Sequence, residues 1–282
     1  MQIIRDISSL RQAVSALRQQ GGRIALVPTM GALHEGHLSL VRAAKARADH
    51  VVVSIFVNPI QFGPNEDLDA YPRKEEADAA LLRAEGAALL WAPTVGAMYP
   101  EGFATRITVR GVSEGLCGGA RPGHFDGVAT VVTKLFNQVR PDVALFGEKD
   151  YQQLAVIRRM VADLDQPVEI VGVPIVRGAD GLALSSRNAY LDADQRARAV
   201  ALSRAMRAGV ARLEAGEAPG PVLERIRADL AEAGFAPVDY VELRDADSLV
   251  PVEKLERPGR LLGAAWLGTT RLIDNFPVKS VG

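Results

Sequence analysis

Two histidines, His34 and His37, lie three residues apart with Gly36 between them, where the chain passes from an apolar run to a helical pattern. The apolar run at 24–27 predicts a buried strand, and the apolar periodicity from about 38 to 48 predicts a helix. The first N–H groups of a helix lack partners and carry the positive end of its dipole. Two imidazoles at this spacing can point at one ligand. The segment therefore predicts a site for a nucleoside triphosphate.

Two other interpretations of the histidine pair compete with this one. A helical zinc motif needs two residues between its histidines and a third ligand, and the remaining candidates His50, His124 and Cys117 suggest no tetrahedral cluster. The second alternative is a helix start with two solvated histidines, which a tetrapeptide alone does not exclude. We expect no metal site built by the protein itself, and the choice between the other two depends on the rest of the chain.

Composition favours a cytoplasmic enzyme. The chain has 282 residues, 48% of them hydrophobic, so one large or two unequal domains can form without a disulfide framework. The single cysteine fits a reducing compartment. The N-terminus lacks the apolar core of a signal peptide, and no apolar run approaches the ~20 residues of a membrane span. The formal net charge of -1 argues against a nucleic-acid partner.

Strand and helix patterns alternate through the first two-thirds of the chain. Uninterrupted apolar strands between helices are typical of a parallel sheet covered on both faces. We therefore predict a Rossmann-like doubly wound α/β domain with its ligand at the carboxyl ends of the strands. The expected strands cover 23–27, 51–57, 87–91, 106–110, 143–146 and 169–173. Besides the helix that follows the histidines, helices are expected at about 74–84 and 150–163. Two more are expected to begin at capping residues, one running from Asp6 to about Gln20 and the other from Asp126 to Val139.

Composition shifts after Val176. Residues 192–214 are rich in alanine and arginine with a helical period, and a second helix is expected at about 222–233. Three extended runs close the chain, which predicts a smaller C-terminal α+β domain with an antiparallel sheet. These runs are 238–243, 260–266 and 270–273, and the predicted domains are 1–176 and 177–282.

Polar residues follow the ends of two expected strands. Lys149, after the strand at 143–146, can supply a point charge to phosphates, and Gln153 lies on the same helical face four residues later. Asn58 and Gln61 follow the strand at 51–57, so their amides offer neutral donors and acceptors at the expected ligand edge. Helix capping and turn formation are the alternative roles of these residues.

A loop of small hydroxyl groups and a guanidinium lies at the edge of the second domain. Ser185 and Ser186 can donate to phosphate oxygens, and Arg187 can bind them bidentately. An ordinary polar turn is the alternative for such a sequence.

Five blocks of the sequence, in order, resemble one family. The histidine pair resembles the His-x-Gly-His signature of the nucleotidyltransferase superfamily, which includes class I aminoacyl-tRNA synthetases. Its surroundings are closer still to the pantothenate synthetase (pantoate–β-alanine ligase) family. The matching blocks are 27–41, 56–63 with 71–73, 121–127, 146–153 and 180–188.

The resemblance implies an ATP-dependent ligase. Pantoate would attack the α-phosphate of Mg·ATP to give a pantoyl-adenylate and pyrophosphate, and β-alanine would then give pantothenate and AMP. It also implies a cytoplasmic homodimer, ATP as a substrate and Mg²⁺ held mainly by the ATP phosphates. Two alternatives are a nucleotidyltransferase acting on a phosphorylated acceptor and a non-enzymatic ATP-binding sensor.

The resemblance also assigns roles to individual residues. The implied catalytic residues are His34, His37, Lys149, Ser185, Ser186 and Arg187. The implied ATP-binding residues are Met30, Gly31, Ala32, Leu33, His34, Glu35, Gly36, His37, Gly147, Glu148, Lys149, Asp150, Val176, Leu184, Ser185, Ser186 and Arg187. The implied pantoate or β-alanine contacts are Met30, Asn58, Gln61 and Gln153.

Four features near these blocks have open roles. Arg121 lies near the active site in the family, whereas His124 is expected to cap or pack locally. Asp78 could reach magnesium through water, although one carboxylate is thin support for a metal contact. The loop 180–188 is expected to act as a lid.

Overall fold

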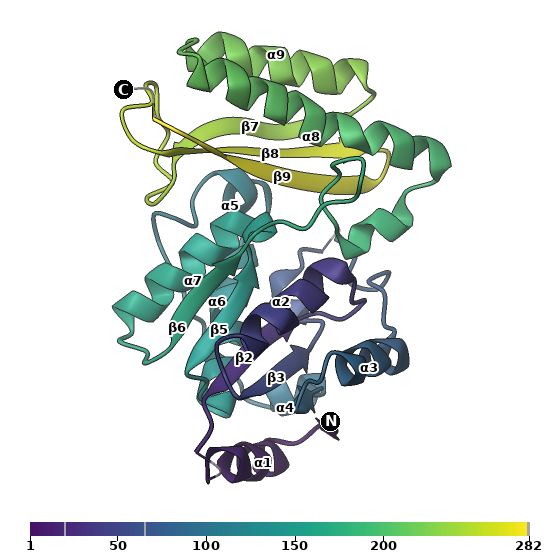
Figure 1. Cartoon of the computed structure of the whole chain (residues 1–282), viewed down its shortest axis with the longest axis vertical. Helices are drawn as coiled ribbons and strands as arrows, with labels where there is room; N and C mark the ends of the chain where they lie inside the picture. The colour runs from purple at the N-terminus through teal and green to yellow at the C-terminus, as the bar shows by residue number, and fades with distance from the viewer. Residues whose placement is uncertain (20, 65, 281–282) are drawn as a thin grey trace. The chain divides into compact units, whose positions relative to one another are not determined.

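The structure, a computed structural model, describes residues 1–19, 21–64 and 66–280, and the helix end predicted at Gln20 lies outside them. Within these residues six strands form a sheet in which every neighbouring pair is parallel (Figure 1). The strands are β1 (Gln2–Ile4), β2 (Ile24–Thr29), β3 (His50–Ile55), β4 (Leu89–Trp91), β5 (Val143–Gly147) and β6 (Glu169–Val173). The helices that accompany them are α1 (Ile7–Gln19), α2 (Glu35–Lys45), α3 (Glu75–Ala84), α4 (Val95–Met98), α6 (His124–Val139) and α7 (Tyr151–Asp163).

The strand order β1-β4-β3-β2-β5-β6 reverses direction between β2 and β5. From β2 the chain moves outward through α2 and α3 to β3 and β4, and it then returns to β5 beside β2 and moves outward to β6 on the other side. In such sheets, ligands bind outside the carboxyl ends of the strands at the reversal point. The arrangement confirms the predicted Rossmann-like doubly wound fold.

Both faces of this sheet are buried. Alternate residues of a strand point to opposite faces, so the contacts of neighbouring residues show what covers each face. On one face, Ala25, Val27 and Val53 belong to a core that includes residues of α2 and α3. On the other, the indole Nε1 of Trp91 donates to Gln138 of α6 at 3.0 Å. Burial on both sides explains why the strands read as continuous apolar runs.

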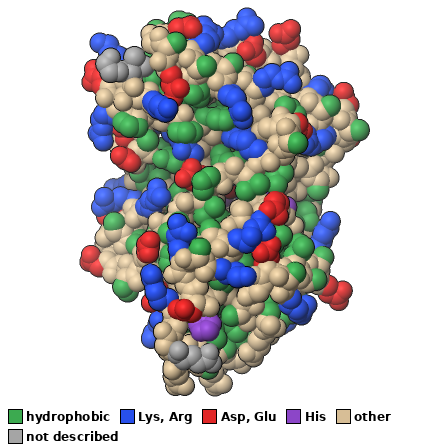
Figure 2. Space-filling view, in the orientation of Figure 1, with side chains coloured by type: hydrophobic (Ala, Val, Ile, Leu, Met, Phe, Trp, Pro, Cys, Tyr) green, Lys and Arg blue, Asp and Glu red, His purple; other side chains and the backbone are tan. Residues whose placement is uncertain are grey.

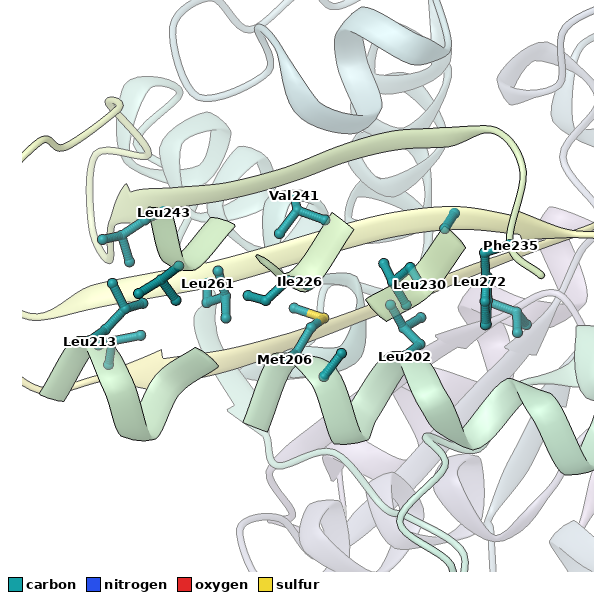
Figure 3. Packing of buried hydrophobic residues seen from close by; sticks show 14 of the residues in the cluster. Leu202, Met206, Leu213, Ile226, Leu230, Phe235, Val241, Leu243, Leu261 and Leu272 are labelled. Atoms are coloured by element: carbon teal, nitrogen blue, oxygen red, sulfur yellow. The ribbon is translucent and has the colours of Figure 1, made fainter. Parts of the chain in front are cut away.

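An antiparallel sheet in the order β7-β8-β9 forms the core of the C-terminal region. Its strands are β7 (Val238–Asp245), β8 (Gly259–Leu267) and β9 (Thr270–Val278), and its helices are α8 (Ala193–Glu214) and α9 (Pro219–Glu232). Met206 of α8 and Ile226 of α9 lie over this sheet, near Leu261 of β8 (Figure 3). These elements confirm the predicted smaller α+β part with an antiparallel sheet.

Some local predictions were wrong. Residues 106–110 form no strand, and the Ile107 N–H instead donates to the Thr130 hydroxyl at 3.0 Å. Asp126 lies inside the first turn of α6, whose N-cap is Gly123. Helix α2 begins at Glu35, earlier than the apolar periodicity indicates, because its first turn carries the polar histidine motif. Strand β1, helix α4 and helix α5 (Leu116–Ala120) are too short to show a period and were not predicted.

The chain divides into two compact units. The first comprises Met1–Val109, Arg121–Glu148 and Val156–Pro174, and the second comprises Arg110–Ala120, Lys149–Ala155 and Ile175–Gly282. The second unit therefore takes in α5 and the turn that carries Lys149. A single domain boundary at Val176 stays a prediction.

Surface charges of both signs are interspersed on the face drawn in Figure 2, in keeping with a formal net charge of -1. Within the described ranges, no helix combines the length and the apolar character needed to cross a membrane.

Candidate active site

The buried carboxylate of Asp78 holds the turn between β2 and α2. Asp78 accepts the N–H groups of Ala32 and Leu33, each at 2.8 Å, and is 2% exposed. Gly31 has a φ of +84°, and a Cβ on it would lie 3.1 Å from the Asp78 carboxylate, so the turn favours glycine. The structure thus gives Asp78 a role in holding this turn, and the magnesium contact considered from the sequence stays a hypothesis.

His34 and His37 cap the start of α2. His34 is the N-cap, and its Nδ1 accepts the N–H of Gly36 at 3.1 Å, while His37 Nδ1 accepts the N–H of His34 at 3.3 Å. The two ring centroids are 4.1 Å apart. Glu35 is exposed and pairs with Arg42. The imidazoles thus lie together at the positive end of the helix, as their spacing predicted.

Each of these imidazoles has Nε2 as its proton donor. In a neutral ring one nitrogen donates and the other accepts, and Nδ1 accepts a backbone N–H in both rings. The proton is therefore on Nε2, the nitrogen farther from the backbone. Two N–H donors at a helix N-terminus can stabilise charge that develops on phosphate oxygens.

Met30, Asn58 and Gln61 lie together beyond the ends of β2 and β3. Asn58 Nδ2 donates to Gln61 Oε1 at 2.9 Å, and Gln61 Nε2 lies 3.3 Å from Met30 Sδ. The Tyr99 hydroxyl donates to Asn58 Oδ1 at 2.7 Å, and burial raises the pKa of Tyr99, so this group stays protonated. The structure therefore brings together three of the four residues predicted to bind the acid and amine substrates.

Arg121 and His124 hold the backbone of Gln61. A guanidinium only donates, so Arg121 donates to His124 Nε2 at 3.1 Å, and the proton on His124 Nδ1 goes to the Gln61 carbonyl at 2.9 Å. Arg121 Nε also donates to Glu66 at 2.8 Å. Burial alone would raise the pKa of Glu66, but Arg121 beside it holds that pKa below its ordinary value. His124 therefore packs locally, as predicted.

Gly127 of α6 is where this helix meets the 3-10 turn η1 (Pro59–Gln61). A Cβ on Gly127 would lie 2.5 Å from the Ile60 carbonyl oxygen and 2.6 Å from Gln61 Cα. The Gly127 carbonyl also accepts from Asn58 Nδ2 at 3.1 Å. Only glycine allows this close approach of the two backbones.

Strand β5 leads through the 3-10 turn η2 (Glu148–Asp150) into α7. The Lys149 side chain is 19% exposed, and its Nζ lies 3.7 Å from an Asp150 carboxylate oxygen. A Cβ on Gly147 would meet no described atom within 4 Å, so packing gives no reason for glycine there. The predicted phosphate residues of this segment follow the strand end that lies at the reversal point of the sheet.

The adjacent glutamines of α7 have different environments. Gln152 is 4% exposed, accepts the N–H of Cys117 at 2.9 Å and donates to the carbonyl of Val112 at 3.1 Å. Gln153 is only partly buried. Gln152 is thus a structural link between α7 and the segment 110–120, and Gln153 stays the candidate for substrate binding.

Val176 and Leu184 close a tight hairpin that leads into the 3-10 helix η3 (Ser186–Tyr190). The Leu184 N–H donates to the Val176 carbonyl at 3.0 Å. Ser185 caps η3, and its hydroxyl accepts the N–H of Arg187 at 3.3 Å. The residues predicted for this part of the nucleotide site therefore form one ordered segment.

A metal site made by the protein alone has no support in the described part of the chain. No group of three or more His, Cys, Asp or Glu side chains there is arranged to hold a metal ion.

Comparisons with known proteins agree over nearly the whole chain. Residues 2–277 match the family described as pantoate-beta-alanine ligase. A pantothenate synthetase from Rhizorhabdus wittichii is 63% identical over 279 residues, which cover 99% of each chain. The crystal structure of pantothenate synthetase from Thermus thermophilus has a TM-score of 0.92 at 46% identity, covering 98% of this chain and 99% of that one. The pantoate-beta-alanine ligase from Francisella tularensis, complexed with beta-gamma ATP and beta-alanine, has a TM-score of 0.83 at 34% identity, covering 98% and 97%.

Proposed function

The chain belongs to the pantoate-beta-alanine ligase family, and we propose that it condenses (R)-pantoate with β-alanine to form pantothenate. ATP drives the reaction through a pantoyl-adenylate, with release of pyrophosphate and then AMP. The observation that carries this proposal is the family match over residues 2–277, together with a histidine pair at the carboxyl end of β2, beside the point where the sheet reverses. The Francisella tularensis relative, complexed with beta-gamma ATP and beta-alanine, supports these two substrates.

The first half-reaction needs positioning and electrostatic stabilisation more than covalent chemistry. The pantoate carboxylate attacks the α-phosphorus of Mg·ATP, a P–O bond forms, and the bond to pyrophosphate breaks. His34 and His37 donate from Nε2 to phosphate oxygens as negative charge develops on them. Lys149 supplies a point charge, and Arg187 with the hydroxyls of Ser185 and Ser186 binds further phosphate oxygens.

Neutral amides suit the binding of pantoate. Gln61 and Gln153 offer donors and acceptors to its hydroxyl and carboxylate groups. Asn58 is 1% exposed and spends both Nδ2 protons on Gln61 Oε1 and the Gly127 carbonyl, so it orients the Gln61 amide and does not itself donate to pantoate. A cationic clamp on the carboxylate would reduce its nucleophilicity towards phosphorus. Met30 supplies an apolar wall whose sulfur contacts Gln61.

The second half-reaction replaces AMP by an amine. The β-alanine amine attacks the acyl carbon of the adenylate, a C–N bond forms, the bond to the AMP oxygen breaks, and the amine loses a proton. A mixed anhydride of this kind reacts with water, so it must be shielded, and we propose that residues 180–188 act as the lid. We further propose a cytoplasmic homodimer that uses Mg²⁺ held mainly by the ATP phosphates, which the resemblance to the family supports.

An isotope experiment tests the adenylate route. With Mg·ATP and pantoate labelled with ¹⁸O in the carboxylate, we expect pyrophosphate release and, once β-alanine is added, one labelled oxygen in AMP. Cys117, buried beside the Tyr240 hydroxyl at 3.1 Å, takes no part in this chemistry, so Cys117→Ala should stay active. Label in inorganic phosphate with ADP as the product would indicate an acyl phosphate instead. Release of pyrophosphate that requires a phosphorylated acceptor in place of pantoate would favour a different nucleotidyltransferase.

A glycine substitution tests the placing of Gln61. Gly127→Ala should push η1 away from α6 and raise the KM for pantoate about tenfold, because small displacements of a binding group have large kinetic effects. The KM for ATP should change much less. Steady-state pyrophosphate release, with each substrate varied in turn, measures both constants. Gly96→Ala is the matched control, because a Cβ there meets nothing within 4 Å. Equal changes in both KM values would argue against a specific effect on the pantoate site.

A further inference from the structure

The face of the C-terminal sheet opposite α8 and α9 carries polar residues. In β8 and β9, Leu261 and Leu272 belong to the apolar core beneath the helices. Leu262 pairs with Asn275 in the ladder, so Arg260, two residues before Leu262, is a diagonal neighbour of Asn275 on the polar face. Arg260 is 7% exposed and Asn275 is 2% exposed. Buried polar groups of this kind need hydrogen-bond partners.

Asn275 finds one of its partners in the turn that carries Lys149. Its Nδ2 donates to the Lys149 carbonyl at 2.9 Å, and its Oδ1 accepts from Arg260 Nε at 2.7 Å. Because a guanidinium can only donate, Oδ1 must face Arg260 and Nδ2 must face Lys149. The orientation of the amide is therefore fixed by its surroundings.

Arg260 also contacts the start of α7, at Tyr151, two residues after Lys149. Its guanidinium carbon lies 4.0 Å from the centroid of the Tyr151 ring. The Tyr151 hydroxyl donates to the Ala246 carbonyl at 2.9 Å, which connects the start of α7 to the end of β7. A buried guanidinium that stacks on an aromatic ring holds both groups in place.

We propose that Asn275, backed by Arg260, is a positioning residue that sets the place from which Lys149 reaches the ATP phosphates. This inference rests on the role given to Lys149 in the proposed function. The lysine stem is flexible, so the protein controls the position of Nζ through the position of the Lys149 backbone. The hydrogen bond from Asn275 acts directly on that backbone, 126 residues away in sequence.

Asn275→Asp provides a selective test. The variant keeps an acceptor for Arg260 Nε but places a carboxylate oxygen against the Lys149 carbonyl, where wild type has a donor. We expect the KM for ATP in pyrophosphate release to rise about tenfold, on the scale of one lost hydrogen bond. The KM for pantoate should stay within about twofold of wild type. Arg260→Lys, which retains the charge but loses the Nε bond, should give a smaller change in the same direction.

Coupling to Lys149 separates positioning from simple destabilisation. Lys149→Ala should impair ATP use, and adding Asn275→Asp to it should change the KM for ATP little further, because the positioned group is gone. Leu272→Ala is the stability-matched control: it lies on β9 but in the apolar core, so it should lower the melting temperature and leave both KM values unchanged.

The outcomes distinguish the two assignments. Normal ATP use by Lys149→Ala would refute the role of Lys149 and, with it, this inference. A second outcome would overturn the positioning role alone. In it, Lys149→Ala raises the KM for ATP, whereas Asn275→Asp and Arg260→Lys leave both KM values unchanged, as Leu272→Ala does. Fully additive effects in the double variant would also overturn it.

Discussion

Replacing either histidine of the motif by alanine should lower the rate of pantoyl-adenylate formation by roughly 10²–10³-fold, the scale associated with loss of one donor to a developing oxyanion. The structure gives the physical reason. Nδ1 of each ring is held by a backbone N–H, so each Nε2–H is fixed as a donor before the substrate arrives. Single-turnover pyrophosphate release with saturating Mg·ATP and pantoate measures the effect.

The histidine variants should differ in stability as well as in rate. His34 is the N-cap of α2, and loss of such a cap costs about 1 kcal/mol. His37 completes the cap by accepting the His34 N–H, but at 3.3 Å against 3.1 Å for the bond from Gly36 to His34, so His37→Ala should destabilise α2 less than His34→Ala. His34→Asn is the control, because asparagine restores a good cap without an imidazole donor. If His34→Asn recovers the rate, the histidine acts through the cap and its assignment as a phosphate donor is wrong.

Much of the fold could be predicted from the sequence because its signals are local. Strands buried on both faces read as unbroken apolar runs, and the residues that follow β2, β3 and β5 then share one edge of a parallel sheet. The family resemblance supplied the chemistry of this edge. Short elements such as β1 and α4 escaped prediction because three or four residues cannot show a period.

The supports of the site could not be predicted in the same way. Gly127 contacts the backbone of Ile60 and Gln61, and Asn275 donates to the Lys149 carbonyl; each partner is more than 60 positions away. Neither a glycine nor an asparagine indicates such a distant contact by its residue type alone. A glycine within an apolar helix and an asparagine within a strand were the only signals, and both have common alternative explanations. The role of Asp78 in holding the turn could not be predicted either, because its partners are the backbone N–H groups of Ala32 and Leu33, which a sequence pattern does not show.

Loss of the Asp78 carboxylate should have the other large effect. Asp78→Ala leaves the N–H groups of Ala32 and Leu33 without their acceptor, and each buried unsatisfied group costs about 1–3 kcal/mol. The turn should relax from its positive φ values at Gly31 and Ala32 and displace the histidines. We expect adenylation to fall by about 10²-fold or more, since a displacement near 1 Å can have that effect. Denaturant unfolding and pyrophosphate release measure the two consequences.

Asp78→Asn shows whether one neutral acceptor oxygen is enough to hold the turn. Burial raises the pKa of Asp78, and the N–H groups of Leu33 and Ala32 oppose that shift only in part. The folded protein therefore binds this proton more tightly than the unfolded chain, so the contribution of Asp78 to stability increases as the pH falls through the folded pKa and is lost as the pH rises. Asp78→Asn keeps one acceptor oxygen but places an NH2 group against the second backbone N–H, so at neutral pH it should be more stable than Asp78→Ala and less stable than wild type, and its adenylation rate should stay low. A variant with asparagine that adenylates pantoate at the wild-type rate would show that the ionised carboxylate does not shape the phosphate turn.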